Sequence, residues 1–525
     1  MEVILAIDIG TSSVKVAIIN FKDQLVKNFQ TNYPTHYLKP NILEQNPEDW
    51  WYAVKSGIYQ ILKETQNSKI SKYSIIGIAC CGHSPTLVCV DKQGEILRPA
   101  IIWQDSRAIK EVKYIKEKLK GKLSYRSIMT SPLSASSRIA KLSWLKNNEP
   151  NTLKKVYTIL EPKDYINCKL TGEYKTSLLS GRDFVDVKTG KVHSKFLNML
   201  EIPESVIPKA VPSHSIIGTT TKSLEEEIGL HKGIPVIAGE MDSITSIMGT
   251  GITKKNMCYN ISGTSEIIGI SIDQQINLSR TKKQPYFSYP FYNNLQIIFE
   301  ATQASGKSIN WFIKNIIGSD KSPNKLMLTN EKNDFLKMNL LIFLPYIEGE
   351  RSPIWDSRAR GIFFGLNSQH SKFDLYRAIL EGIGFSILQN FETLRSISNK
   401  DDIPDYFRVS GGGAENNHLN QIKADILGKK VVTTKFCESG LLGGAILAMI
   451  GLGIYSFDDA VKKMVHTDKI FQPNMEKHYH YYAHLFPIYK NLYRHNKELF
   501  KDLRKIYQEA NNESGCFIRE KEYKN

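Results

Sequence analysis

The chain has 525 residues, of which 41% are hydrophobic and 23% charged, and its formal net charge at pH 7 is +16. This length exceeds one hydrophobic core, and the composition is that of an ordinary globular protein, which excludes a disordered or fibrous chain. The 69 Lys and Arg residues are scattered along the chain and form no compact stripe with interleaved aromatic residues. The charge therefore predicts a solvated, lysine-rich surface and no nucleic-acid partner.

The cysteines argue against a disulfide-rich or zinc-binding protein, and the apolar segments argue against a secreted or membrane-spanning one. The seven Cys residues include no CxxC pair and mostly have apolar neighbours, which is typical of reduced thiols and not of a disulfide framework or a zinc site. No basic region precedes the N-terminal apolar run, so no signal peptide is predicted. Residues 439–457 lack charge but are barely long enough to cross a bilayer, and we expect a buried core helix there. We expect a cytoplasmic protein with no membrane partner.

The first motif is LAIDIGTSSVKVAIIN, residues 5–20, in which an apolar strand carrying Asp8 meets a small turn at Gly10, Thr11 and Ser12 before a second apolar strand. One interpretation is an ordinary β-hairpin. The other is a phosphate cradle, in which backbone N–H groups face anionic oxygens while the carboxylate holds a hydrated Mg²⁺. This stretch alone leaves both interpretations open.

The segments that follow alternate between helix and strand patterns. Asn46 can cap a helix whose first position suits Pro47 and whose apolar face includes Trp50. Residues 74–82 and 86–91 are apolar, which predicts buried strands. Such alternation favours an α/β fold.

Residues 257–272, MCYNISGTSEIIGISI, repeat the strand, Gly-Thr-Ser, strand plan about half a chain later. Two such hairpins predict duplicated domains that each present a phosphate-binding turn to a shared cleft. We therefore predict a first domain over residues 1–250 and a second over 251–485. Residues 486–525 are predicted to form a basic helical tail whose polar end, from about residue 511, is frayed.

Two segments carry candidate functional side chains, and each also has a structural interpretation. In VIAGEMDSITSIMGTG, residues 236–251, a strand pattern runs into a helix pattern at Asp242, which is either a helix N-cap or a general base at the mouth of a cleft. In RPAIIWQDSRA, a strand delivers Trp103, Asp105 and Arg107. These three grip a polyol, or else they are a core Trp beside a surface ion pair.

Two glycine-rich segments are weaker signals. Residues 301–311, ATQASGKSINW, loosely match a P-loop but lack its first glycine and a nearby strand that ends in Asp for Mg²⁺. We do not expect a P-loop there, although Gly306 beside a helix start can still approach a nucleotide. Residues 409–432 place three glycines between a strand and a helix, which permits close approach of the backbone to a ligand.

Together these segments resemble the FGGY family of carbohydrate kinases, nearest to its xylulose kinase-like members, from about residue 4 to 485. Residues 360–382, RGIFFGLNSQHSKFDLYRAILEG, match the C-terminal signature of that family, and residues 141–148, KLSWLKNN, match most of the N-terminal one. The chain departs at Arg138, where the family prefers Pro, Ser or Thr. The resemblance implies two actin-like (ribonuclease H-like) α/β domains around a central cleft, and ATP and Mg²⁺ as cofactors.

The resemblance also implies a set of site residues, which divide by role. They are Asp242 as catalytic base; Asp8 beside the metal; Thr11, Ser12, Gly263 and Thr264 in two phosphate turns; Gly306 and Asn310 at the nucleotide-side helix start; Gly412, Gly413 and Asn416 in the adenine pocket; and His83, Ser84, Trp103 and Asp105 at the sugar.

The sugar-binding loop is where the chain departs most from the family. Xylulose kinases typically carry Gln-Met-His-Gly where this chain has Cys81-Gly82-His83-Ser84, and residues 175–186 are shorter than usual and lack an Asp after the threonine. We therefore expect transfer of the γ-phosphoryl of ATP to a ketose such as D-xylulose, with gluconate, ribulose and polyols left open. An actin-like or chaperone-like ATPase and a catalytically inactive sugar sensor are the alternatives from other classes. Homodimer formation also stays open.

Overall fold

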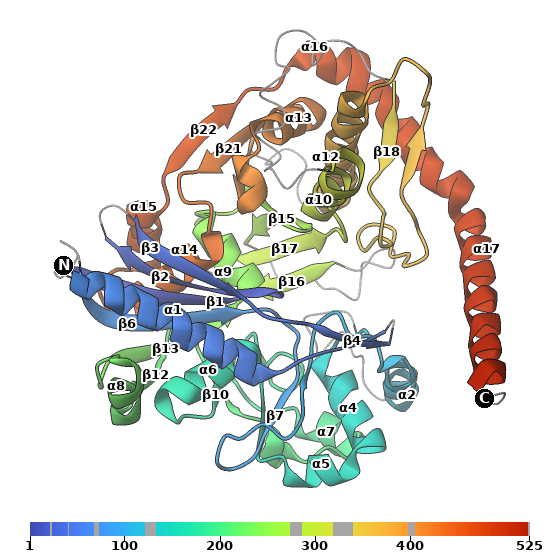
Figure 1. Cartoon of the computed structure of the whole chain (residues 1–525). Coiled ribbons are helices and arrows are strands. Elements are labelled where there is room, and N and C mark those ends of the chain that lie inside the picture. Colours follow the sequence, from blue (N-terminus) through green and yellow to red (C-terminus); the bar gives the residue numbers. More distant parts are fainter. Residues whose placement is uncertain are drawn as a thin grey trace.

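The computed structural model describes residues 1–21, 24–39, 41–67, 73–120, 133–273, 286–318, 340–396 and 405–522, without the side chains of 24–26, 65–67, 508 and 510–522. Two mixed β-sheets, one from each half of the chain, carry helices on their faces (Figure 1). This is the predicted α/β architecture.

The first sheet has the strand order β12-β13-β6-β1-β2-β3. Its strands are β1 (Glu2–Ile9), β2 (Ser13–Asn20), β3 (Gln24–Asn32), β6 (Ser74–Gly82), β12 (Ile216–Thr219) and β13 (Pro235–Met241). Alternate residues of β1 enter two different cores, because the sheet is covered on both faces. Val3, Leu5 and Ile7 pack with helices α1 (Pro47–Asn67) and α6 (Pro162–Thr171), whereas Ile4 and Ala6 pack with α14 (Ser439–Gly451).

The second sheet has the strand order β16-β17-β15-β14-β20-β21-β22. Its strands are β14 (Cys258–Ser262), β15 (Glu266–Ile272), β16 (Phe287–Pro290), β17 (Gln296–Ala301), β20 (Tyr406–Ser410), β21 (Lys430–Thr434) and β22 (Thr467–Phe471). In each sheet an antiparallel hairpin is followed by two parallel neighbours: β6 and β13 beside β1, and β20 and β21 beside β14. The two halves therefore share one topology, as the repeated hairpin predicted.

The remaining elements surround these sheets. Beside the first sheet, a separate apolar core lies among the shorter elements of residues 87–206. The elements of the first half are β4 (His36–Lys39), β5 (Ile42–Gln45), β7 (Val88–Val90), β8 (Ala100–Ile101), α2 (Ile109–Leu119), α4 (Arg138–Asn148), α5 (Pro150–Lys155), β9 (Thr158–Leu160), β10 (Lys175–Ser177), α7 (Ser194–Met199), β11 (Lys209–Val211), α8 (Lys222–Ile228) and α9 (Asp242–Gly249). Those of the second half are α10 (Gly306–Phe312), β18 (Ile342–Leu344), β19 (Ile362–Phe364), α12 (Lys372–Arg395), η4 (Gly412–Glu415), α13 (Asn417–Leu427), α15 (Phe457–Met464), α16 (Met475–Lys477) and α17 (Ala483–Glu522).

Helices α9 and α14 join the two halves by direct backbone contact. A Cβ atom on Gly443 would lie 1.9 Å from the carbonyl oxygen of Thr245, and one on Gly249 would lie 2.2 Å from that of Ser439. Only glycine permits this spacing. Helix α14 also packs on the first sheet and is buried from Ser439 to Met449, which confirms the predicted core helix. Among the described residues, no helix combines the length and apolar character that a bilayer crossing needs.

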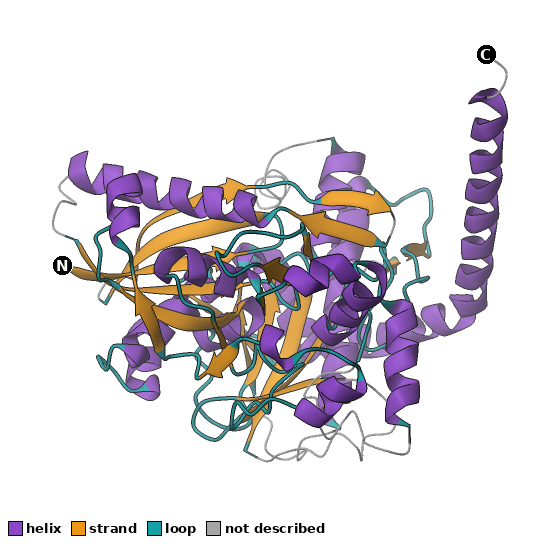
Figure 2. Cartoon of the chain, turned by 90° about the horizontal axis from the view of Figure 1, so that it is seen from below, coloured by secondary structure: helices purple, strands orange, loops and turns teal. Residues whose placement is uncertain are grey.

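Helix α17 begins in the second core and then leaves it. Leu485, Tyr489 and Phe500 are buried against the body of the protein, and the distal part of the helix extends away from the body in both views (Figures 1 and 2). The predicted frayed end of the tail falls where side chains lie outside the described residues.

Candidate active site

The first turn, Gly10–Ser12, is held in place from three directions. The Gly10 N–H donates to the carbonyl of Ser13 at 2.9 Å, which closes the hairpin. The Gln45 amide donates to the carbonyl of Thr11 at 2.7 Å, and the indole N–H of Trp103 donates to the Thr11 hydroxyl at 3.0 Å. The hairpin interpretation is therefore correct for the backbone, and the turn is rigid enough to receive a ligand.

Asp8 lies near the end of β1, beside the first turn. The Cys81 thiol donates to Asp8 Oδ1 at 3.3 Å. Burial raises the pKa of Asp8 to about 6, while this thiol and the Lys15 ammonium lower it. Lys15 in turn pairs with Glu438 at 2.6 Å, and this ion pair links the first sheet to the residue before α14. Two elements far apart in sequence thus meet beside Asp8.

Asp242 is the first residue of α9, directly after β13. The N-cap position belongs to Met241, so Asp242 lies one place inside the helix, where its Oδ1 accepts from the Ser243 N–H at 2.6 Å. Burial, together with the carboxylates of Asp8 and Glu161, raises the pKa of Asp242 to about 8 against the opposing backbone hydrogen bond of Ser243. A carboxyl group with a pKa near neutrality is suited to accept a proton.

The second turn, Gly263–Ser265, is exposed at Gly263 and Thr264. The first N–H groups of α10 support it: Gly306 donates to the carbonyl of Gly263 at 3.1 Å and Lys307 to that of Thr264 at 3.2 Å. A Cβ atom on Gly306 would lie 2.5 Å from the Gly263 oxygen. The P-loop-like segment is therefore a support for the second turn, since its N–H groups are already bonded to protein.

A buried ionic network lies beneath the second turn. The Lys423 ammonium pairs with Glu266 Oε2 at 3.3 Å, and Glu266 Oε1 accepts from the hydroxyls of Ser262 at 2.7 Å and Ser305 at 2.6 Å. Burial lowers the pKa of Lys423, and the Glu266 carboxylate opposes that shift. This network anchors both strands of the hairpin and the start of α10, so the turn has a fixed base.

The glycines before α13 form a third turn, whose Gly411 N–H donates to the carbonyl of Cys437 at 3.0 Å. A Cβ atom on Gly413 would meet the Ser262 hydroxyl at 2.1 Å, whereas one on Gly412 would meet nothing within 4 Å. Only Gly412 therefore borders open space.

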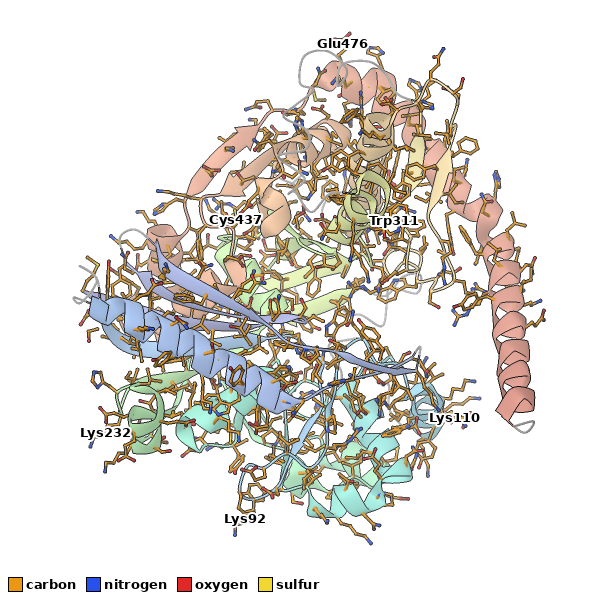
Figure 3. The ribbon with its side chains drawn as sticks, viewed as in Figure 1. Lys92, Lys110, Lys232, Trp311, Cys437 and Glu476 are labelled. Carbon is orange, nitrogen blue, oxygen red and sulfur yellow. The ribbon has the colours of Figure 1, made fainter. Side chains whose placement is uncertain are left out.

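Two further residues expected at the nucleotide, Asn416 and Asn310, lie at the start of α13 and on α10. Asn416 caps α13 by accepting from the Leu419 N–H at 3.0 Å, and Asn310 is exposed on α10. Figure 3 labels Trp311, next to Asn310, and Cys437, which precedes α14; both lie in the half of the molecule built on the second sheet.

Two of the predicted sugar-side residues, His83 and Ser84, belong to the loop after β6. His83 is buried, its Nδ1 lies 2.9 Å from the Thr86 hydroxyl, and among the described residues its Nε2 has no hydrogen-bond partner. Burial lowers the pKa of His83 to about 3, so its ring is neutral. The Ser84 hydroxyl donates to Glu161 at 2.7 Å and accepts from Arg182 at 3.1 Å. The Glu161 carboxylate also raises the pKa of Asp242, so the charge beside this loop acts on the base.

Trp103 and Asp105 have different surroundings. Asp105 is fully buried and accepts from the Leu43 N–H at 2.7 Å and from the Arg107 guanidinium at 2.8 Å. It therefore fixes the loop that carries Trp103. The indole ring of Trp103 instead faces the guanidinium of Arg351, which belongs to the second half of the chain.

Several charged residues of the site were not predicted from the sequence. They are Lys15, Glu161, Arg182, Arg351 and Glu438. The one available signal was Lys15, a charged residue within an otherwise apolar strand directly after the first turn.

Comparison with known proteins agrees with this architecture. The model of the FGGY family of carbohydrate kinases, N-terminal domain, matches residues 3–249, and the C-terminal domain model matches residues 258–452. A xylulose kinase of Staphylococcus xylosus is 30% identical over 496 residues, which cover 94% of this chain and 100% of that protein. A gluconokinase of Bacillus subtilis is 28% identical over 501 residues, which cover 93% of this chain and 95% of that protein.

Solved structures show the same fold. A ligand-bound xylulose kinase from Lactobacillus acidophilus superposes with a TM-score of 0.82 at 25% identity and covers 96% of this chain and 100% of its own. A gluconate kinase from the same organism gives a TM-score of 0.81 at 26% identity, and the match covers 96% of this chain and 99% of that one. The chain belongs to the FGGY family of carbohydrate kinases. It has the two-domain fold of that family and is a sugar kinase that uses ATP.

Proposed function

We propose that the protein transfers the γ-phosphoryl group of ATP to a hydroxyl of a ketose, with D-xylulose as the first candidate. The observation that carries this proposal is the position of Asp242, whose carboxyl has a raised pKa beside both Asp8 and the Ser84–Glu161 pair. Xylulose kinases among the relatives support the choice of sugar. The remaining predicted site residues keep their expected roles as part of this proposal.

The residues beside the first turn fit a Mg²⁺ ion that is shared with ATP. Mg²⁺ prefers oxygen ligands, keeps several waters and usually binds through one or two carboxylates plus substrate phosphates. Within the described part of the chain, no three His, Cys, Asp or Glu residues group as a metal cage. Asp8 supplies one carboxylate beside a turn with two hydroxyl residues, Thr11 and Ser12, which matches that donor set.

Positioning and charge neutralisation account for most of the proposed mechanism. The first and second turns present N–H groups and hydroxyls to the phosphates, and Lys15 adds a positive charge. Bound Mg²⁺ supplies further charge neutralisation on the phosphates. Asp242 accepts the proton of the attacking hydroxyl, which Ser84 and His83 orient. The raised pKa of Asp242 makes it a stronger base than an exposed aspartate.

A sugar acid is the second candidate, because two guanidinium groups lie near the sugar loop. Arg138 pairs with Glu161 at 3.3 Å, and Arg182 donates to Ser84. Both side chains are buried, and among the described residues Arg138 Nη2 and Arg182 Nε have no hydrogen-bond partner. Unsatisfied guanidinium N–H groups favour a carboxylate ligand, and the gluconokinase relatives agree with that possibility.

The experiment is a measurement of ADP release with Mg²⁺ over D-xylulose, D-ribulose, gluconate and glycerol, with NMR of the product to locate the phosphorylated hydroxyl. D-xylulose is expected to give the highest kcat/KM. Higher kcat/KM with gluconate selects the second candidate. ADP release that no sugar stimulates contradicts both candidates and favours an ATPase.

The division of the chain into functional parts belongs to the same proposal. Residues 1–250 carry the sugar loop and Asp242, residues 251–485 carry the nucleotide side, and residues 486–525 form a helical tail whose first part packs in the second core. The ranges matched by the two family models support this division. We place the enzyme in the cytoplasm, since the described cysteines are free thiols.

A further inference from the structure

The loop between β18 and β19, residues 345–361, brings Arg351 from the second half of the chain to the first. The Arg351 guanidinium donates to the carbonyl of Thr302 at 2.5 Å and lies over the indole ring of Trp103. The loop contains only turns and isolated bridges. Because neither a helix nor a strand ladder fixes its course, contacts from neighbouring elements determine where Arg351 lies.

Within this loop, the backbone of Asp356 is bonded to the residue directly before Arg351. The Glu350 N–H donates to the carbonyl of Asp356 at 3.0 Å, and Glu350 Oε1 accepts from the Arg351 N–H at 2.8 Å. The Asp356 carboxylate is buried and accepts from the Arg358 guanidinium at 2.9 Å. The position of Asp356 therefore determines the position of the backbone at Arg351.

Helix α17 supplies a further hydrogen bond to Asp356. The Tyr493 hydroxyl donates to Asp356 Oδ2 at 3.0 Å, and a hydrogen bond to an ionised acceptor is stronger than one between neutral groups. Tyr493 also packs edge-on against Tyr346 near the start of the loop, with the ring centroids 6.1 Å apart. One side chain of α17 thus contacts the loop on both sides of Arg351.

Two more residues on the same face of α17 contact this loop. The Tyr489 hydroxyl lies 3.0 Å from that of Tyr346, and Arg504 donates to the Ser357 hydroxyl at 3.1 Å. At 3.6 residues per turn, Tyr489, Tyr493 and Arg504 lie within about 60° of one another around the helix. Tyr489 is buried in the second core, and α17 runs beside β18 (Figure 1). The helix is therefore a firm support for the loop.

We propose that Tyr493 is a positioning residue, which holds Arg351 against Trp103 by way of Asp356. The inference rests on the proposed function, because it gives α17 a part in coupling the sugar side to the nucleotide side. Helix α17 lies beyond residue 452, where the match to the C-terminal family model ends. Arg358 still holds Asp356 when the Tyr493 hydroxyl is removed, so the loop becomes looser and does not unfold.

Tyr493→Phe tests the proposal, since phenylalanine keeps the ring against Tyr346 and removes only the hydroxyl. The measurement is the affinity for a non-hydrolysable ATP analogue with and without a saturating concentration of the sugar that the wild type uses best. The stimulation of nucleotide binding by sugar is expected to fall at least about fivefold, at an unchanged melting temperature. Tyr479→Phe is the matched control, because Tyr479 is 60% exposed in the helical segment before α17. This control is expected to behave like the wild type.

A double-mutant cycle shows whether Tyr493 acts through Arg351. If it does, Tyr493→Phe has no further effect on the coupling in an Arg351→Gln background, and the two substitutions are strongly non-additive. A contribution of Tyr493 to the fold alone would instead add its own loss to that of Arg351→Gln.

Amide hydrogen exchange gives a readout that does not depend on the sugar. Tyr493→Phe is expected to increase exchange across residues 345–361 and to leave exchange in both sheets unchanged, because only the support of the loop is lost.

Three results would overturn the proposal. They are equal coupling in the wild type and Tyr493→Phe, additive losses in the double variant, and unchanged exchange in the loop. A wild type whose ADP release no sugar stimulates would instead refute the proposed function, and the exchange measurement would then still decide whether Tyr493 holds the loop.

Discussion

The guanidinium of Arg351 lies over the indole ring of Trp103, with its central carbon 5.5 Å from the ring centroid. Trp103 donates to Thr11 of the first turn, while Arg351 Nη2 lies 3.4 Å from the Ser265 hydroxyl of the second turn. Arg351 also donates to the carbonyl of Thr302. One stacked pair therefore connects the two turns that we expect to hold phosphates, and it joins the sugar side to the nucleotide side.

Arg351→Gln is expected to weaken the coupling between sugar and nucleotide binding. A desolvated cation over an indole ring contributes about 2 kcal/mol, so its loss corresponds to about a 30-fold effect. The measurement is the affinity for a non-hydrolysable ATP analogue with and without saturating sugar. Arg360→Gln is the matched control, because Arg360 donates only to carbonyls of its own loop in the described structure. Equal coupling in wild type and Arg351→Gln would refute this role.

Asp242→Asn is expected to fold, to bind both ligands and to lose about 10² to 10⁴ in kcat, because asparagine accepts the Ser243 hydrogen bond but no proton. Asp459→Asn is the control, since Asp459 also lies in the first turn of a helix, α15, away from the site. Turnover of Asp242→Asn within a few-fold of wild type would show that Asp242 is only structural.

The same substitution is expected to stabilise the free protein at high pH. The pKa of Asp242 rises from 3.8 to about 8 on folding, so the native state binds more protons and stability falls as pH rises between about 4 and 8. Asparagine has no ionisable carboxyl group, so the variant does not lose stability as pH rises in this way. The difference in melting temperature between Asp242→Asn and wild type therefore grows from pH 5 to pH 8, and a constant difference would contradict it.

The value of kcat/KM is expected to rise from pH 6 to pH 8, since a general base acts only when it is unprotonated. Asp8 and Asp242 have pKa values of about 6 and about 8, and each carboxylate influences the other. The rise of kcat/KM with pH therefore reports the titration of both groups together. Rates measured from pH 5.5 to pH 9 at constant ionic strength test this. A flat profile from pH 6 to pH 8 would contradict the assignment.

Gly306→Ala is expected to raise the KM for ATP at least tenfold and to leave the sugar KM nearly unchanged. The new methyl group meets the Gly263 oxygen at 2.5 Å and must displace the second turn. Gly412→Ala is the comparison, because it faces open space and should leave the fold intact. If Gly306→Ala raises only the sugar KM, the second turn does not serve the nucleotide.

Asp105→Ala is expected to raise the sugar KM and to leave ATP affinity nearly unchanged. The substitution removes the acceptor of the Leu43 and Arg107 hydrogen bonds and so loosens the loop that carries Trp103. Losing such a buried acceptor also costs about 1–3 kcal/mol of stability. A variant that loses ATP binding but keeps its sugar KM would contradict this placement.

The local features of the site could be predicted, whereas its long-range contacts could not. Both hairpins and the start of α9 at Asp242 follow from apolar runs that end at small or acidic residues. The pairing of Lys15 with Glu438 joins residues 423 positions apart, and no local pattern contains it. The hydrogen bond from the Leu43 N–H to Asp105 could not be predicted either, because Leu43 belongs to a different strand, β5.

The contact between α9 and α14 has a mechanical consequence. Gly249 and Gly443 bring the two helices together backbone to backbone, so the two helices lie closer to each other than larger side chains at these positions would allow. Packed helices of this kind move by small sliding shifts, so we expect only small movements at this contact when the two domains move. Asp242 begins one of its helices and Glu438 directly precedes the other. Because Asp242 lies one turn from the contact between Thr245 and Gly443, we expect the base to keep its position while more distant parts of the two domains approach each other.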